Sequence, residues 1–138
     1  PAVAAVQGRY TDSDSQAVVA RCSALDLAAR CAAIDGDEVD HVCTGNSAYR
    51  VEALRAVGGF DETLGYGYDN DASYRLVASG FKLRFRRDAT AAHAWRQTLG
   101  GYLTQQFGLG YGRLDVIARH PARVTGDEYD VEIVDYHG

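Results

Sequence analysis

The chain has 138 residues, of which 46% are hydrophobic and 24% charged, and its net charge is −5 at neutral pH. This length and composition are typical of one soluble globular domain. The acidic balance argues against general nucleic-acid binding, which needs a basic face. No apolar run approaches the roughly 20 residues of a membrane-spanning helix, so we expect neither nucleic-acid binding nor a transmembrane segment.

The first residue is Pro1 and the chain contains no methionine, which favours an excised or processed piece of a longer protein. Its three cysteines, Cys22, Cys31 and Cys43, form neither a disulfide framework nor a Cys-x-x-Cys motif. We therefore expect buried free thiols and a reducing environment. The expected location is the cytoplasm, including the inner face of the membrane.

The first third of the chain predicts a strand followed by a long helix. Residues 2–6 form a small apolar run, ended by Gln7 and Gly8, that is typical of a buried strand. Residues 11–15 offer side chains that can cap a helix. Apolar residues then recur at three- and four-residue spacings over 16–34, which predicts an amphipathic helix.

Residues 39–93 predict shorter elements separated by glycines. In chain order, these are a strand at 39–43, a polar turn at 44–47, a helix at 50–57, a loop at 60–67, a helix at 69–79, and strands at 81–86 and 89–93. Gly58 and Gly80 follow the two helices, and glycine readily adopts the left-handed conformation that ends a helix.

The last third predicts one long helix over 102–120, interrupted by three glycines and ended by Pro121. Residues 129–136 alternate apolar and acidic side chains, which suits an edge strand or a loosely held end. Helices and strands alternate along the chain, so the predicted fold class is α/β. Few strands precede residue 44, and open sheet edges would then permit self-association.

Two carboxylates at a predicted helix start carry the clearest chemical signal. Asp69 and Asp71 lie where free backbone amides favour negative charge. Their side chains diverge by about 200° around the helix, so one can face a pocket while the other pairs with Arg75 four residues on. We expect Asp71 to be structural. For Asp69, a helix cap and a chemical role both remain open from the residues alone.

Several motifs in order resemble the second half of the catalytic domain of family 2 glycosyltransferases, which have the GT-A fold. They are Gly45-Asn46-Ser47-Ala48-Tyr49-Arg50, Gly58-Gly59-Phe60-Asp61-Glu62, Tyr68-Asp69-Asn70-Asp71, Arg75, Gly80, His93-Ala94-Trp95, Gln105-Gln106-Phe107 with Gly110, Gly112 and Arg113, and His120-Pro121. The resemblance covers residues 45–121. One departure is Tyr68, which stands where the family often has Glu.

This resemblance implies a partial, Rossmann-like GT-A fold with a mixed sheet and flanking helices. Residues 1–44 would end the donor-side half and supply a connecting helix, 45–121 would form the acceptor and catalytic-base half, and 122–138 would be a tail. Asp69 matches the family's general base, which removes the proton of the acceptor hydroxyl. The implied reaction is a single displacement with inversion at the anomeric carbon.

The resemblance also implies roles for the neighbouring motif residues. Gly45, Asn46, Tyr68 and Trp95 match positions on the acceptor side, where aromatic rings suit the apolar faces of sugars. For Trp95, packing in the core is an equal alternative.

Three further residues match the donor side of the family. Gln106 and Arg113 would face the donor phosphates. His93 would supply one ligand to Mg²⁺ or Mn²⁺ in the full-length enzyme, with simple packing at a strand end as its alternative. We expect the isolated chain to bind no metal tightly, since one histidine cannot form a site.

The resemblance predicts a full-length enzyme that transfers sugar from a nucleotide-diphospho-sugar to an acceptor hydroxyl. No Asp-x-Asp motif precedes the first predicted strand, so we expect the chain to be inactive alone. One alternative is a non-catalytic carbohydrate-binding or interaction module built on the same fold. Another is a metal-dependent hydrolase that uses Asp69, Asp71 and His93.

Overall fold

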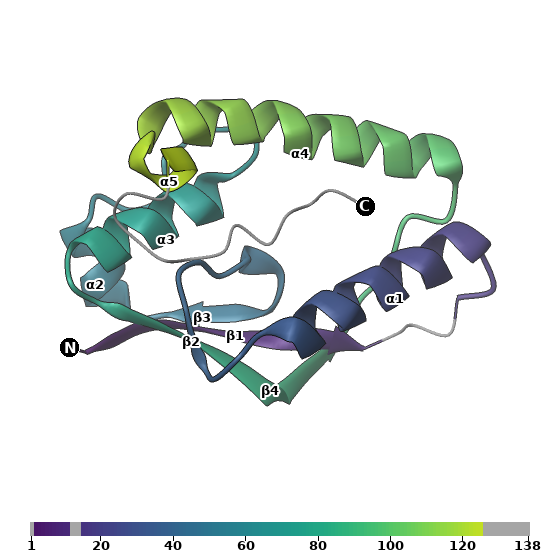
Figure 1. Ribbon diagram of the computed structural model, residues 1–138, viewed down its shortest axis with the longest axis horizontal. Coiled ribbons are helices and arrows are strands. Elements are labelled where there is room, and N and C mark those ends of the chain that lie inside the picture. The colour runs from purple at the N-terminus through teal and green to yellow at the C-terminus, as the bar shows by residue number, and fades with distance from the viewer. Residues whose placement is uncertain (1, 12–14, 126–138) are drawn as a thin grey trace.

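The computed structural model describes residues 2–11 and 15–125 of the chain (Figure 1). Strands alternate with helices along most of this length. The elements are β1 (Val3–Thr11), α1 (Val18–Ala33), β2 (Glu38–Val39), the 3₁₀ helix η1 (Thr44–Asn46), β3 (Ser47–Tyr49), α2 (Val51–Ala56), α3 (Tyr68–Ala78), β4 (Lys82–Ala92), α4 (Leu99–Arg119) and α5 (Ala122–Thr125).

The described strands form one mixed sheet with the order β2-β4-β1-β3. β1 runs parallel to β4 and antiparallel to β3, and β2 pairs antiparallel with β4. The predicted α/β class, with a mixed sheet and flanking helices, is therefore confirmed. The arrangement is consistent with part of a Rossmann-like glycosyltransferase fold.

The two central strands are longer than predicted. β1 continues past Gly8 to Thr11 because it pairs with β4 along its whole length. The two strands predicted at 81–86 and 89–93 are one strand, β4. The pairing steps from Gly8↔Arg86 to Arg9↔Thr90, so residues 87–89 form an irregularity in β4. Turn-like Arg87-Asp88 is thus accommodated inside a strand.

The predicted strand at 39–43 is wrong over most of its length. Only Glu38–Val39 pairs with the sheet. Val42 instead enters the core, where its amide donates to the Ser73 hydroxyl on α3 at 3.1 Å and its carbonyl accepts from the Tyr49 hydroxyl at 3.3 Å. An unpredicted strand, β3, forms directly after η1 and pairs with β1.

The four predicted helices are confirmed, with shifted ends. α4 begins at Leu99, three residues before the predicted start, because the Thr98 side chain caps it by accepting from the Gly101 amide. Gly58, Gly59 and Gly80 all have positive φ, as expected of residues that end helices. α1 begins after Ala17 without a side-chain cap, and part of the predicted capping segment (12–14) lies outside the described residues, as does the tail at 129–136.

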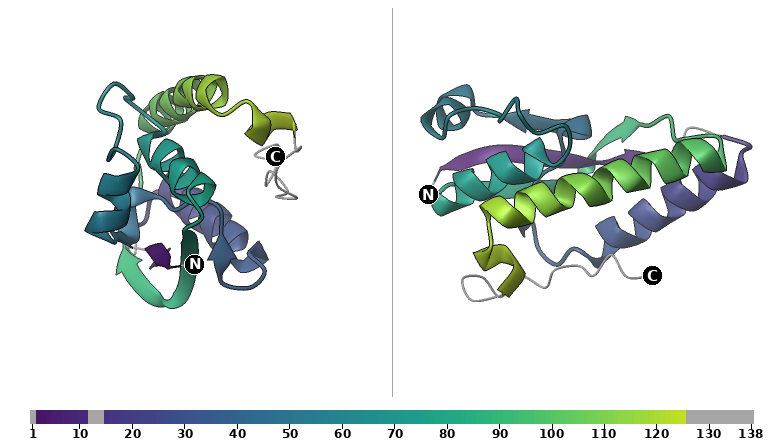
Figure 2. Two further views of the ribbon diagram at one scale, coloured as in Figure 1. Left: turned by 90° about the vertical axis from the view of Figure 1, so that its left-hand side faces the viewer. Right: turned by 90° about the horizontal axis from the view of Figure 1, so that it is seen from above.

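The core forms between the sheet and α3, and α4 lies on the far side of α3 (Figures 1 and 2). The buried apolar cluster consists of Ala4, Ala5, Val42, Ala53, Leu76 and Leu83. Leu83 and Phe85 are two residues apart on β4 and share one face. Leu83 contacts the α3 side, while Phe85 lines a cavity with Ala28 and Cys31 of α1.

The three cysteines differ in burial. Cys22 is exposed, so the prediction of a buried thiol is wrong for this residue, whereas Cys31 and Cys43 are partly buried. Burial, followed by the nearby negative charge of Asp69, raises the pKa of Cys43 to about 12. Cys43 is therefore a protonated, unreactive thiol at neutral pH. Within residues 2–11 and 15–125, none of the helices has the length and hydropathy of a membrane span.

Glycine lets α4 approach the loop before α3. A Cβ atom on Gly112 would lie 2.4 Å from the Tyr66 Cβ and 3.0 Å from its carbonyl oxygen, whereas one on Gly110 would meet nothing within 4 Å. Tyr66 therefore lies directly against α4 at Gly112.

We predict that Gly112→Ala lowers the free energy of unfolding by about 1–3 kcal/mol, because α4 and Tyr66 must move apart. Gly110→Ala is the matched control, and it should raise stability by up to about 1 kcal/mol through helix propensity. Urea denaturation followed by circular dichroism measures both. Equal effects of the two substitutions would contradict the close approach at Tyr66.

Candidate functional site

Asp69 lies in the first turn of α3 and connects this helix to η1. Its Oδ2 accepts a hydrogen bond from the Thr44 amide at 3.2 Å, and its Oδ1 accepts one from the Asn70 amide at 3.0 Å. The side chain is half-buried, and the residue before the helix is Gly67, whose φ of 76° sets the direction of the incoming chain. Each carboxylate oxygen accepts one hydrogen bond from a backbone amide and can accept a further one.

The neighbours of Asp69 come from η1 and from the end of β1. The Tyr68 and Thr44 hydroxyls lie 3.3 Å apart. A Cβ atom on Gly45 would stand 1.6 Å from the Tyr10 hydroxyl, so only glycine leaves room for this ring. Burial, followed by electrostatic coupling to the Cys43 and Asp69 side chains, raises the pKa of Tyr10. Tyr10 therefore remains a neutral phenol beside the carboxylate.

Tyr10, His93 and Trp95 form an aromatic cluster at one end of the sheet. The ring centroids are 4.6 Å apart for Tyr10 and His93, 4.5 Å for His93 and Trp95, and 6.2 Å for Tyr10 and Trp95. β1 and β4 are parallel. Tyr10 lies near the end of β1 and His93 just after β4, so both side chains lie at the same end of the sheet. Sequence reasoning missed Tyr10 because it ended the first strand too early.

Asn46 has a structural task next to this cluster. Its Nδ2 donates to the Arg9 carbonyl at 3.0 Å and to the Ala89 carbonyl at 3.3 Å. These are the two strands that separate at the irregularity in β4, so Asn46 supplies a donor where the strand ladder is interrupted. Acceptor binding by Asn46 would therefore have to use its side-chain oxygen.

Gln106 and Arg113 lie on α4, both exposed. They are seven residues apart and so project from the same side of the helix. The structure does not place them with Asp69, Tyr10, His93 and Trp95, which come from the first turn of α3, the end of β1 and the segment after β4.

Asp71 points the other way from Asp69 and is 3% exposed. Its Oδ2 accepts from Arg75 at 2.6 and 3.0 Å, and its Oδ1 lies 2.8 Å from His120 Nε2. Burial opposes the charge, but the bonds from Arg75 and His120 outweigh it and hold the pKa of Asp71 below its usual range. The predicted structural role is confirmed, and His120 is an additional partner that the sequence did not indicate.

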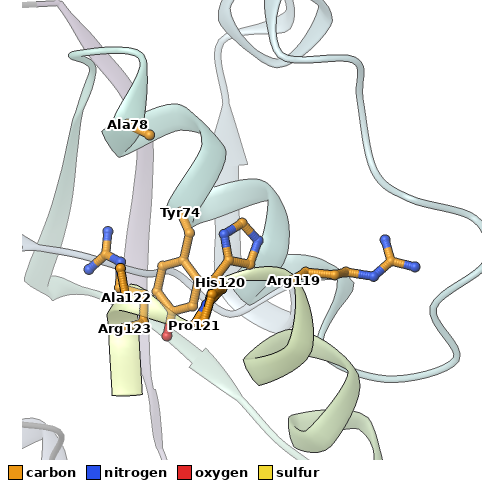
Figure 3. Close-up of a pocket in the computed structure, with 7 residues that line it drawn as sticks. All are labelled: Tyr74, Ala78, Arg119, His120, Pro121, Ala122 and Arg123. Atoms are coloured by element: carbon orange, nitrogen blue, oxygen red, sulfur yellow. The ribbon is translucent and has the colours of Figure 1, made fainter. Parts of the chain in front are cut away.

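A cavity of about 240 Å³ lies beside His120, between α3 and α5 (Figure 3). Its three basic side chains are each matched to a carboxylate: Arg119 with Asp61, His120 with Asp71, and Arg123 with Asp40. Arg123 also lies over the Tyr74 ring, 4.4 Å from its centroid. The cavity therefore belongs to the packing of these helices, and its charges are already balanced.

A second cavity, of about 400 Å³, lies under α1 and includes Tyr10, Arg9 and Arg87 among its lining residues. Arg9 donates to the Arg87 carbonyl, and Arg87 donates to the carbonyls of Ile34 and Gly36 after α1. The side chains of Arg9 and Arg87 are thus hydrogen-bonded to backbone carbonyls and do not form an open anion-binding site. Asp69 lines neither cavity.

The described residues do not make a metal centre. Over 2–11 and 15–125 there is no group of three or more His, Cys, Asp or Glu side chains that could share one ion. His93 contributes a single imidazole, packed between two aromatic rings. The ligands of a divalent cation would therefore have to come largely from other residues, and the hydrolase alternative finds no metal site in this part of the chain.

Comparison with known proteins points to sugar transfer. The chain is 34% identical over 104 residues to the pre-mycofactocin glycosyltransferase of two Mycobacterium tuberculosis strains, a match that covers 75% of this chain and 22% of the relative. It is 33% identical over 73 residues to the succinoglycan biosynthesis protein ExoA of Rhizobium meliloti, covering 53% of this chain and 22% of that protein. The chain thus spans about a fifth of the length of these relatives.

Two other comparisons were negative. No family model matches the chain. No solved structure matches it either. The relatives are therefore the comparison that bears on function, and the glycosyltransferases among them support a sugar-transferase kind of protein.

We predict that Asp71→Asn lowers the free energy of unfolding by about 3 kcal/mol, because it leaves Arg75 without its buried partner charge. The pKa of Asp71 is lowered in the folded state, so its contribution is present above the unfolded pKa of about 3.9 and is lost as the pH falls through the folded value. As the pH falls, the free energy of unfolding of the wild type, measured by urea denaturation, should therefore decrease more steeply than that of the variant.

Asp26→Asn is the control for this measurement. Asp26 and Arg30 have the same four-residue spacing on α1, but their side chains are 60% and 28% exposed. Removing an exposed pair costs only about 0–1 kcal/mol. A similar cost for Asp26→Asn and Asp71→Asn would show that burial of the Asp71 pair is unimportant.

Proposed function

We propose that this chain is the acceptor-binding and catalytic-base part of a family 2, inverting glycosyltransferase with a GT-A fold. The observation that carries the proposal is the Asp69 carboxylate, fixed at the start of α3 by the Thr44 amide. It is supported by the 34% identity to the pre-mycofactocin glycosyltransferase. The whole enzyme would move a sugar from a nucleotide-diphospho-sugar to an acceptor hydroxyl.

In the proposed reaction, Asp69 accepts the proton of the acceptor hydroxyl as the bond forms. The acceptor oxygen attacks the anomeric carbon from the side opposite the nucleoside diphosphate, and the bond from that carbon to the diphosphate oxygen breaks with its electron pair. One displacement inverts the configuration. The hydrogen bonds from the Thr44 and Asn70 amides orient the Asp69 carboxylate, so little reorganisation is needed when the proton moves.

The remaining assignments belong to the same proposal. Gly45, Asn46, Tyr68 and Trp95 would line the acceptor side, and Gln106 and Arg113 would face the donor phosphates. His93 would give one ligand to Mg²⁺ or Mn²⁺, with the other ligands and the nucleotide pocket supplied outside the described residues. The metal, when bound, would neutralise charge on the leaving diphosphate. The proposed location is cytoplasmic or at the inner face of the membrane.

A non-catalytic carbohydrate-binding module is the second candidate. Both Asp69 oxygens accept hydrogen bonds from backbone amides. A purely structural carboxylate would do the same, and this observation favours the second candidate. The two functions differ in whether loss of the charge at position 69 affects turnover or only the fold.

We predict that Asp69→Asn in the intact enzyme reduces kcat by about 10²–10⁴-fold, because the amide keeps the shape but cannot accept the proton. Binding of the acceptor should change little. Initial-rate measurements with the donor sugar, together with circular dichroism to check the fold, give both values.

Asp35→Asn is the matched control, since Asp35 is an exposed aspartate that follows α1. It should turn over at the wild-type rate. Turnover of Asp69→Asn within about tenfold of wild type would exclude Asp69 as the base.

We also predict that the 138-residue chain alone neither transfers sugar nor binds Mn²⁺ tightly, because the donor pocket and most metal ligands would lie elsewhere. A coupled assay for released nucleoside diphosphate and calorimetric titration with Mn²⁺ measure these two properties. Sugar turnover by the chain alone would overturn the division of the site, and tight Mn²⁺ binding would favour the hydrolase alternative.

A further inference from the structure

The outward side of α4 is a broad apolar surface. Six large apolar side chains on it are between 37% and 76% exposed: Leu99, Leu103, Phe107, Tyr111, Leu114 and Ile117. They recur at three- and four-residue spacings, so they share one side of a helix about 31 Å long. We call these six residues the α4 face.

The core of the molecule lies behind the other side of α4. Gly112 and Val116 are its buried residues, and both contact the segment before α3. In the two views that show α4 along its length, it is the outermost helix, with no described element over its outward side (Figures 1 and 2). The α4 face therefore has no partner among the described residues.

A glycine in the middle of the α4 face, Gly110, has no role in the packing of residues 2–11 and 15–125. Gly112 is needed because Tyr66 lies against it, but a Cβ on Gly110 would meet no atom within 4 Å. Glycine inside a helix costs about 1 kcal/mol relative to alanine. Gly110 lies on the same side as Leu103, Phe107 and Leu114, where it would allow the backbone of another helix to come close.

We propose that the α4 face is the contact surface between two copies of this chain. Covering these six side chains, which are 37% to 76% exposed, in both copies would remove apolar surface on the order of the roughly 1,000 Å² needed for a specific interface. The six side chains are apolar, and Gln106 and Arg113 border them on the Gly110 side. An apolar centre with polar residues at its rim has the composition of a homodimer interface. This contact differs from one through the sheet edges, because β2 and β3 offer only two and three residues each.

Charge favours a second copy over a lipid surface. Helices that lie in a membrane interface are typically rich in Lys and Arg on their polar side. α4 carries only Arg113, Asp115 and Arg119, and Arg119 pairs with Asp61. With a net charge of −5 for the whole chain, attraction to anionic lipid would be weak.

A two-fold axis close to Gly110 gives the simplest arrangement. Two antiparallel copies of α4 would then cross at their glycines, and Leu103 near one end would meet the partner's Ile117. A self-complementary surface of this kind is what a two-fold dimer requires, since each copy presents the same patch.

The first test is the double substitution Phe107→Glu with Leu114→Glu in the 138-residue chain. Sedimentation velocity across a dilution series should show a dimer for the wild type and a monomer for the variant, with a dissociation constant raised by at least about a hundredfold. Both positions are exposed, so circular dichroism should be unchanged.

Leu25→Glu is the matched control, because Leu25 is 69% exposed on α1, away from the α4 face. It should remain dimeric. A wild type that sediments as a monomer throughout, or a dimer unaffected by the double substitution, would overturn the proposal. Flotation of a monomeric wild type with phosphatidylcholine–phosphatidylglycerol vesicles, lost in the double variant, would overturn it in favour of a membrane contact.

A second test is crosslinking through the helix crossing. Gly110→Cys, made with Cys22→Ser to remove the exposed native thiol, should form a disulfide-linked dimer on mild oxidation. The equivalent control is Gly100→Cys, near the end of α4, which should crosslink at least about tenfold more slowly if the axis lies near Gly110. Equal rates at the two positions would contradict this arrangement.

Discussion

The Asp71 carboxylate is held by three hydrogen bonds from Arg75 and His120 where water has almost no access. Arg75 also donates to the carbonyls of Val57 and Gly59, which follow α2. One buried charge thus connects the end of α2, the body of α3 and the end of α4. Because α3 is positioned from both sides, its first turn, and with it Asp69, has a defined place against η1.

The positive-φ glycines and Arg75 act together. Gly58 and Gly59 turn the chain sharply after α2, which leaves carbonyl groups without helical partners. The Arg75 guanidinium donates to two of these carbonyls and to Asp71 at once, a task that suits its planar fork of donors. The Gly-Gly turn and the later Arg are therefore parts of one local structure, although 16 residues separate Gly59 from Arg75.

Local features of the sequence predicted local features of the structure. The helices of residues 50–57 and 69–79 were predicted because a glycine follows each, and the Asp71–Arg75 pair because four residues span one helical turn. The contact of Asp71 with His120 joins residues 49 positions apart, and no spacing rule indicates such a contact. Pairing of β1 with β4 is equally distant, so the true length of β1, and Tyr10 within it, could not be found from periodicity. For Asp69, the position on the helix could be predicted from the sequence, but not the Thr44 amide that fixes its carboxylate.

The irregularity at residues 87–89 has a consequence for how this sheet can vary in evolution. These residues lie between two stretches of β4 that pair regularly with β1. An insertion or deletion inside the irregularity would leave both stretches in register, whereas one between Leu83 and Phe85 would exchange the buried and exposed sides of the strand. Length changes at 87–89 would therefore reshape the segment that contacts Asn46, while His93, which follows the second stretch, and the core keep their places. This offers homologous chains a route to vary this part of the sheet without refolding.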